Sequence, residues 1–245
     1  MIEEIFPLIT FDPGKKIWKC LGTGFFINPT GAFISAKHVF MDSDGKMEKT
    51  LYSAHEPKDG EPYIRPVRQI VVHPNADILI GLLGKKRIKN ENFDAGESPF
   101  CKIDFELLKN DNEIYTLAFP NSQREDLNES EVEFTFTRRL SKGKIIDFHD
   151  CSPVVKNRCY QTNMKVDSGA SGGPVFKNGY IIGVNSSGYS LADDEEPLSF
   201  ITPIDYILDL EVTEKNKMVA VKELVEKGFI KTKPRITATT TDLGN

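Results

Sequence analysis

Short apolar runs, each closed by turn residues, dominate the first 205 positions of this 245-residue chain. The runs are rich in β-branched and aromatic residues, as in GAFISA, PVRQIVV and YIIGVNSS, and turn signals such as NPTG and KNG separate them. This pattern favours many short strands and leaves no room between them for long helices. The chain is therefore predicted to be all-β, as a barrel or a sandwich.

The pattern changes after Pro203. The run PIDYILDL predicts one or two helical turns that begin at the proline, and TEKNKMVAVKELVEKG predicts a longer helix with Thr213 as its N-cap and Gly228 at its end. The polar residues that follow predict a loose tail or an edge strand. Residues 211–245 are too few for a second globular domain, so we expect a C-terminal helix and a polar tail.

Charge and terminal composition exclude several classes of partner. The net charge is −5 and the basic residues are scattered, which gives no reason to expect nucleic acid. Glu3 and Glu4 stand where an export signal carries basic residues, and Pro7 and Thr10 interrupt the apolar run. No window approaches the roughly 18 apolar residues that span a bilayer. We therefore expect a cytoplasmic protein with no membrane partner.

Four cysteines are present, at Cys20, Cys101, Cys151 and Cys159. Disulfides are rare in a reducing cytosol, and no CxxC pair occurs. We expect free, mostly buried thiols, with no metal and no cofactor. The alternative is a zinc site that includes Cys151 and the nearby His149.

The segment DSGASGGPVF places one serine, Ser171, among glycines. Small residues form tight turns, so Ser171 can be read simply as a turn residue. It can also be read as a nucleophile, because glycine lets a substrate carbonyl approach and permits φ values that turn N–H groups towards one point. The segment alone leaves both interpretations open.

An activated serine needs a histidine base, and the base needs an orienting group. All four histidines precede Ser171, which excludes the α/β-hydrolase order although GASGG matches its nucleophile elbow. His38 ends an apolar strand, whereas His55 falls in a polar loop and is expected to be solvated. His73 lies four residues before Asp77, which opens the apolar run ILIGLL and is either a strand-edge cap or a buried, partnered carboxylate.

Three segments, GTGFFINPTGAFISAKHVF, NADILIGLL and DSGASGGPVF, resemble in content and order the signature segments of the chymotrypsin-like (trypsin-like) serine proteases. The stretch QTNMKVDSGASGGPVFKNGYIIGVNSS is most similar to the bacterial HtrA/Deg branch, here without a PDZ domain. The resemblance implies a protease domain over residues 1–210. It would contain two packed six-stranded antiparallel β-barrels, over about residues 5–90 and 100–205, with the active site between them.

The resemblance also implies a role for each candidate site residue. Ser171 would be the nucleophile, His38 the general base and then acid, and Asp77 the group that orients the imidazole. The backbone N–H groups of Gly169 and Ser171 would form the oxyanion hole.

The specificity pocket is assigned by the same alignment. Lys165 would lie near its base, and Ser186, Ser187 and Gly188 would form one wall. The Lys165 ammonium would either favour an acidic substrate side chain or extend into solvent. No acid falls at this position, so a preference for Lys or Arg is not supported.

Two departures from the family bear on control. Val39 follows His38 where secreted relatives carry a half-cystine, so that disulfide is absent. Ala170 stands where zymogen-derived enzymes carry an aspartate, so a newly cut amino terminus would have no partner. The 165–171 loop has few large side chains to anchor it, and we expect a protein partner or substrate to order it.

The leading hypothesis is a serine endopeptidase that acts on a dedicated intracellular protein through an acyl-enzyme intermediate. The alternatives are a catalytically silent trypsin-like module that binds peptides, and a general acyl hydrolase with the same triad.

Overall fold

The structure is a computed structural model. It describes residues 3–12, 14, 17–41, 45–47, 50–58, 60–89, 91–126, 132–152, 154–189, 197–214 and 216–234. Expectations for residues 235–245 of the tail lie outside the described residues.

The first barrel is a closed antiparallel sheet of six strands in the order β4-β1-β2-β3-β6-β5, and β5 pairs back to β4. A short hairpin, β7–β8, extends β5. The strands are β1 (Ile5–Asp12), β2 (Ile17–Phe26), β3 (Ala32–Ser35), β4 (Leu51–His55), β5 (Tyr63–Val72), β6 (Leu79–Leu83), β7 (Lys86–Ile88) and β8 (Glu91–Phe93).

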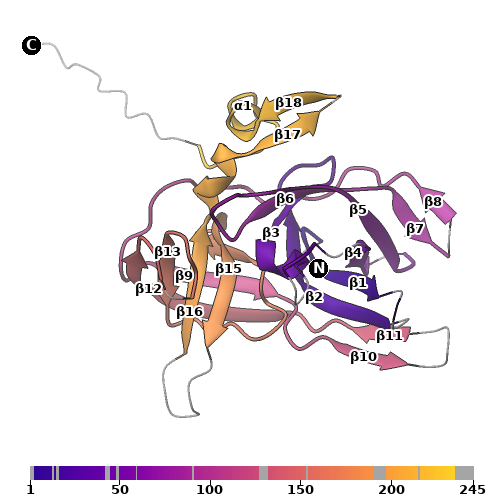
Figure 1. Cartoon of the computed structure of the whole chain (residues 1–245), viewed down its shortest axis with the longest axis horizontal. Coiled ribbons are helices and arrows are strands. Elements are labelled where there is room, and N and C mark those ends of the chain that lie inside the picture. Colours follow the sequence, from indigo (N-terminus) through magenta and orange to yellow (C-terminus); the bar gives the residue numbers. More distant parts are fainter. Residues whose placement is uncertain are drawn as a thin grey trace, which may run out of the picture.

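The second barrel closes in the order β12-β13-β16-β15-β14-β9. Figure 1 shows it beside the first barrel, and a separate hairpin, β10–β11, which lies between β9 and β12 in the sequence, near the first barrel. The strands are β9 (Glu113–Ala118), β10 (Gln123–Asp126), β11 (Val132–Thr135), β12 (Arg139–His149), β13 (Cys159–Thr162), β14 (Pro174–Lys177), β15 (Tyr180–Tyr189) and β16 (Leu198–Pro203). The predicted double six-stranded barrel is confirmed.

Side-chain alternation explains why these segments form barrels. In β9, Ile114, Thr116 and Ala118 are buried while the residues between them are more exposed, which is the two-residue period of a strand with one face on a core. A barrel buries that inner face and pairs the sheet edges, so the short apolar runs of the sequence are all used.

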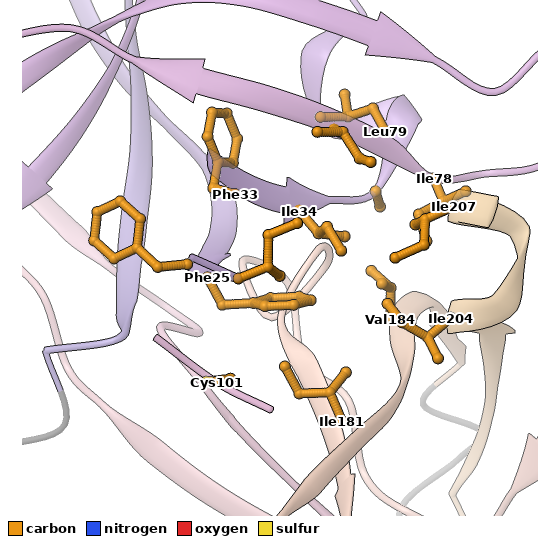
Figure 2. Close-up of a cluster of buried hydrophobic side chains, with 14 of the residues drawn as sticks. Phe25, Phe33, Ile34, Ile78, Leu79, Cys101, Ile181, Val184, Ile204 and Ile207 are labelled. Carbon is orange, nitrogen blue, oxygen red and sulfur yellow. The ribbon is translucent and has the colours of Figure 1, made fainter. Parts of the chain in front are cut away.

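The main hydrophobic core joins the two barrels. Figure 2 shows Phe25 of the first barrel near Ile181 of β15, and Val184 of β15 beside Ile207 of the 3₁₀ helix η2 (Ile204–Asp209). These side chains are fully buried. The packing therefore fixes one barrel against the other, and with them the residues at their junction.

The C-terminal extension differs from the predicted long helix. Residues 211–220 form a hairpin of β17 (Glu211–Glu214) and β18 (Lys217–Ala220), and the helix α1 is confined to Val221–Glu226 (Figure 1). The expected N-cap, Thr213, lies in a strand opposite Met218. The turn signal that the periodicity overlooked is Asn216, whose φ of 65° suits a two-residue hairpin loop.

Two other C-terminal predictions agree with the structure. The turn after Pro203 is the helix η2, and Gly228, with a φ of 72°, follows the end of α1. None of the described helices is long and apolar enough to cross a membrane.

Candidate active site

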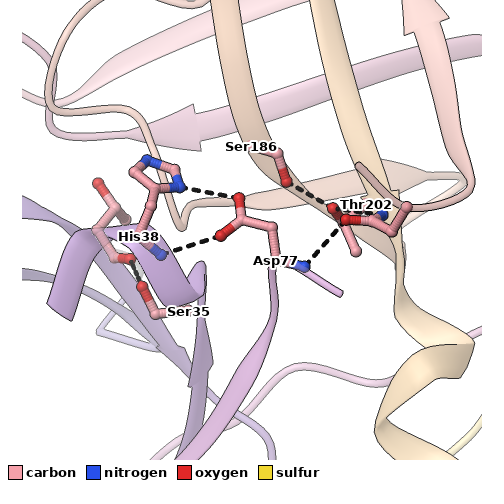
Figure 3. A network of polar contacts seen from close by, with 7 residues as sticks. Ser35, His38, Asp77, Ser186 and Thr202 are labelled. Carbon is pink, nitrogen blue, oxygen red and sulfur yellow. Dashed lines mark hydrogen bonds and ion pairs between the residues drawn. The ribbon is translucent and has the colours of Figure 1, made fainter. Parts of the chain in front are cut away.

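His38 and Asp77 form a two-point contact. His38 lies on the 3₁₀ helix η1 (Lys37–Phe40), directly after β3, and Asp77 lies just before β6. Figure 3 shows the His38 ring and backbone both facing the carboxylate. His38 Nδ1 is 2.8 Å from Asp77 Oδ2, and the His38 N–H donates to Asp77 Oδ1 at 2.9 Å. Both the position and the orientation of the imidazole are therefore fixed.

Asp77 is ionised by its surroundings. Burial raises the pKa of this carboxyl, but the hydrogen bonds from the His38 ring and backbone, the charge of that ring and the hydroxyl of Ser186 outweigh burial and hold the pKa below its usual value. An ionised carboxylate has no proton to donate, so it can only accept from its two His38 partners.

Asp77 is also tied to the second barrel. Its N–H donates to Asn157 Oδ1 at 3.0 Å, and Asn157 Nδ2 donates to Thr202 Oγ1 at 3.2 Å. The Thr202 and Ser186 hydroxyls are 2.6 Å apart (Figure 3). Since Asn157, Ser186 and Thr202 are buried, this chain of polar groups holds the acid from the opposite barrel.

Ser171 lies on the turn before β14, between glycines that the packing requires. A side chain at Gly172 would place its Cβ 2.1 Å from Ser35 Oγ, and the φ of Gly172 is 80°. Gly169, with a φ of 90°, would place a Cβ 2.8 Å from the carbonyl oxygen of Phe119. Only glycine at these two positions lets the turn pack this closely against Ser35 of the first barrel and Phe119 of the second.

The N–H groups of residues 169–173 fall into two sets. Those of Ala170, Gly172 and Gly173 donate to backbone carbonyls within the protein, at 2.8–3.0 Å. Among the described residues, neither the N–H of Gly169 nor that of Ser171 donates a hydrogen bond. These are the two donors that the family resemblance assigned to an oxyanion hole.

The three candidate triad residues line one cavity of about 660 Å³. No hydrogen bond joins Ser171 to His38 within the described part of the chain, although such contacts are often long without substrate. The cavity also contains Ser186, Ser187 and Gly188, as the alignment expected. Its remaining lining residues were not singled out in the sequence: Val154, Val155, Lys156, Val166, Asp167 and Ser168.

The structure does not bring Lys165 to this cavity. Its side chain is 52% exposed, and its ammonium is 3.8 Å from Asp167 Oδ1. Arg139 donates to the other oxygen of Asp167 at 2.6 Å. The Lys165 side chain thus extends towards solvent, with its ammonium near Asp167 at the edge of the cavity.

The remaining histidines lie elsewhere. His73 is buried, accepts the Asn75 N–H at 3.2 Å and packs edge-on against Tyr206. The expectation that His55 is solvated was wrong, because it ends β4 and its ring stacks on Tyr63 with centroids 4.8 Å apart. The polar residues after His55 led to the prediction of a solvated side chain. Its contacts with aromatic rings come from other strands and are set by packing.

The four cysteines are free thiols: Cys101 and Cys159 are buried, Cys20 is partly buried and Cys151 is exposed. In the described part of the chain, no group of three or more His, Cys, Asp or Glu side chains is arranged to hold a metal ion.

Two packed six-stranded antiparallel barrels, with His, Asp and Ser in that chain order around one cavity, define the chymotrypsin-like class of proteins. The family model described as Trypsin matches residues 11–210, so the chain belongs to the trypsin family.

Among known proteins, the chain is similar to a probable periplasmic serine endoprotease, DegP-like, of Pseudomonas putida (strain W619). The two are 24% identical over 192 residues, which cover 78% of this chain and 34% of the relative. The chain therefore spans about a third of the length of that relative.

Solved structures of the same fold include the active form of the Rv3671c protease from M. tuberculosis, with a TM-score of 0.58 and 17% identity over 84% of this chain and 78% of that one. Deg5 has a TM-score of 0.61 and 15% identity, over 86% and 88% of the two chains. The HtrA-type protease AlgW, solved with a decapeptide, has a TM-score of 0.59 and 15% identity, over 83% and 62%. At these identities the likeness concerns the fold.

Proposed function

We propose that the chain is a serine endopeptidase that hydrolyses peptide bonds through an acyl-enzyme intermediate on Ser171. The observation that carries this proposal is the two-point contact between His38 and Asp77 in the cavity that Ser171 lines, where two peptide N–H groups have no acceptor. Membership of the trypsin family and similarity to a DegP-like endoprotease support the same reaction.

The ionised Asp77 selects the reactive form of His38. Because the carboxylate can only accept, the proton on the neutral ring resides on Nδ1, and the lone pair on Nε2 is left to act as the base. As the Ser171 Oγ attacks the substrate carbonyl carbon, its proton passes to His38 Nε2. Asp77 then stabilises the imidazolium that has formed.

The attack converts the carbonyl oxygen into an oxyanion, which the N–H groups of Gly169 and Ser171 would bind. When this tetrahedral intermediate collapses, the C–N bond breaks and His38 returns the proton to the leaving amine. Water then attacks the Ser171 ester with His38 again as base, and the second product leaves as a carboxylic acid.

We further propose that the substrate is a dedicated protein within the cytoplasm. The four free thiols are consistent with a reducing compartment, whereas the DegP-like relative is described as periplasmic. Cell fractionation with an antibody against the chain tests the compartment, and the periplasmic fraction is the outcome that would contradict it.

The proposal is tested with the purified chain, a fluorophosphonate that labels activated serines, and unfolded casein as substrate. Ser171→Ala is expected to lose labelling and cleavage, and His38→Ala to lose nearly all cleavage, while both remain folded. Asp77→Asn should keep the fold but lower kcat by about 10⁴-fold, because the amide stabilises the wrong imidazole tautomer.

Two controls match these variants. Ser141→Ala on β12 and His149→Ala at the end of β12 lie outside the cavity and should retain both labelling and cleavage. Cleavage by folded Ser171→Ala would exclude Ser171 as the nucleophile. A chain that binds peptides but is never labelled would be the catalytically silent module instead, and hydrolysis of esters without peptides would indicate the general acyl hydrolase.

A further inference from the structure

We propose that Thr23 is a positioning residue that holds the candidate oxyanion turn, residues 168–171, from the opposite barrel. The inference rests on the proposed function, since it concerns the turn that carries Ser171. Thr23 lies on β2 of the first barrel and is fully buried, whereas the turn belongs to the second barrel.

Thr23 uses all of its polar groups near this turn. Its N–H donates to the Ser171 carbonyl at 2.9 Å, and its hydroxyl donates to the Gly169 carbonyl at 2.9 Å. The hydroxyl also accepts the Phe119 N–H at 3.1 Å, and the Thr23 carbonyl accepts the Ser35 hydroxyl at 2.8 Å. Thr23 therefore holds the turn at two carbonyls, that of Gly169 through its side chain and that of Ser171 through its backbone.

The direction of the hydroxyl proton follows from its partners. The Phe119 N–H can only donate, so it occupies a lone pair of Thr23 Oγ1 and leaves the single hydroxyl proton for the Gly169 carbonyl. An isosteric valine would fill the same space but leave the buried N–H of Phe119 and the partly buried carbonyl of Gly169 without their partner.

The Gly169 carbonyl lies between the two peptides whose N–H groups have no acceptor. The peptide before it is held by the Asn121 N–H, which donates to the Ser168 carbonyl at 2.9 Å. The peptide after it is held through the Ala170 carbonyl, which accepts the Gly173 N–H at 3.0 Å and Asn185 Nδ2 at 3.3 Å.

Fixing these carbonyls also fixes the N–H groups. In a trans peptide the N–H points opposite to the C=O, so each held carbonyl directs the N–H of the next residue away from its anchor. Glycine rotates more readily than any other residue, which makes Gly169 the weakest point of the turn. The Gly169–Ala170 peptide is held at both ends, because its N–H donates to the Asp167 carbonyl at 3.0 Å and its carbonyl accepts the Thr23 hydroxyl. The Thr23 hydroxyl is the restraint that comes from the opposite barrel.

Thr10 provides a matched control. It is also a fully buried threonine of the first barrel, and its hydroxyl donates to the Thr50 carbonyl at 2.7 Å. Thr10 contacts neither the turn nor the cavity. Thr10→Val therefore removes a buried threonine hydroxyl and its one hydrogen bond without any effect on the orientation of the turn.

The experiment compares Thr23→Val, Thr23→Ser and Thr10→Val in the full chain. It measures kcat, KM, thermal stability and inhibition by a peptide aldehyde, whose adduct places an oxyanion where the reaction forms one. Thr23→Val is expected to lower kcat about 10- to 100-fold, less than the roughly 10²–10³-fold cost of deleting a donor outright, and to weaken aldehyde binding in proportion. KM should change less than about threefold, because substrate binding does not use these donors in the ground state.

Thr23→Ser keeps the hydroxyl and should restore kcat to within about threefold of the wild type, and Thr10→Val should retain wild-type kcat. If Thr23→Val does not fold, Thr23→Ala replaces it with the same expected loss. A folded Thr23 variant that lacks the hydroxyl but has the same kcat as Thr10→Val would overturn this inference and leave the proposed function unaffected. A wild-type chain that neither cleaves nor reacts with fluorophosphonate would overturn the proposed function, and the inference with it.

Discussion

At the scale of single residues, position in the fold gives two histidines different chemistry. His38 is 46% exposed and faces an ionised carboxylate, which suits a group that must gain and lose a proton. His55 accepts or donates one hydrogen bond with Ser53 Oγ at 2.7 Å and is enclosed by aromatic rings. Burial, together with the charges of Arg65 and Lys86, lowers the pKa of His55 to about 3.

A pH dependence of stability follows from His55. The unfolded chain binds a proton there below about pH 6.5, whereas the folded chain stays neutral down to about pH 3. The unfolded state therefore binds more protons in this window, and the free energy of unfolding falls as pH decreases from 6.5 to 3, by up to about 1.4 kcal/mol per pH unit. Urea unfolding at pH 7 and pH 4.5 is expected to show a smaller loss for His55→Phe than for the wild type. An equal loss would contradict the shifted pKa, and His149→Ala, changed on the surface, serves as the control.

At the scale of elements, the C-terminal extension depends on tertiary packing. A two-stranded hairpin such as β17–β18 is marginal in water, and α1 is too short to be stable alone. Val221 at the start of α1 and Ile230 beyond its end are buried in the main core. Lys233 adds ion pairs to Asp104 and Glu106 at 2.8 and 3.0 Å.

Ile230 and its neighbour Phe229 test this dependence. Ile230 is 3% exposed and Phe229 is 54% exposed. Ile230→Ala is expected to lower the free energy of unfolding by about 2–5 kcal/mol, because it removes buried methyl groups and leaves a cavity. Phe229→Ala should change it by only about 0.5 kcal/mol. Urea denaturation measures both free energies of unfolding. A loss for Ile230→Ala as small as that expected for Phe229→Ala would mean that the extension does not contribute to the core.

At the scale of the whole molecule, one hydrophobic cluster spans both barrels, although the second barrel also has clusters of its own, and the barrels exchange hydrogen bonds at the site. The principal cluster contains residues of both barrels and of η2 (Figure 2). Thr23 and Asp77 each contact the opposite barrel within the site. The candidate oxyanion turn is thus anchored without large side chains, contrary to the premise that led us to expect ordering by a partner. The activating partner stays a prediction.

A shared core implies cooperative unfolding of both barrels. Calorimetry of the purified chain is expected to give one transition whose calorimetric and van't Hoff enthalpies agree. Ile181→Ala, in the second barrel, should lower the temperature of that single transition rather than split it. Two transitions, only one of them sensitive to Ile181→Ala, would contradict this expectation.

The sequence determined the features that are encoded within short segments. Strand periodicity and turn residues predicted an all-β barrel or sandwich. The resemblance of three ordered motifs to a known family implied the double barrel and brought His38, Asp77 and Ser171 together as candidates. The glycines around Ser171 predicted a tight turn with φ values that favour glycine, and Gly169 and Gly172 have φ values of 90° and 80°. Strand periodicity, turn residues and short motifs can be recognised in the sequence because each depends on residues a few positions apart.

Only the tertiary structure decided the contacts made between distant segments. Thr23 and Gly169 are separated by 146 positions, and no local pattern relates a threonine in a strand to a turn of the other barrel. The same holds for Asn157 behind Asp77, and for His55, which looks solvated in sequence but is enclosed by rings of other strands. In the extension, the spacing of apolar residues predicted a helix, but Glu211–Glu214 and Lys217–Ala220 pair as strands around a turn at Asn216. Periodicity shows which face of a segment is buried, but only packing determines what that face contacts.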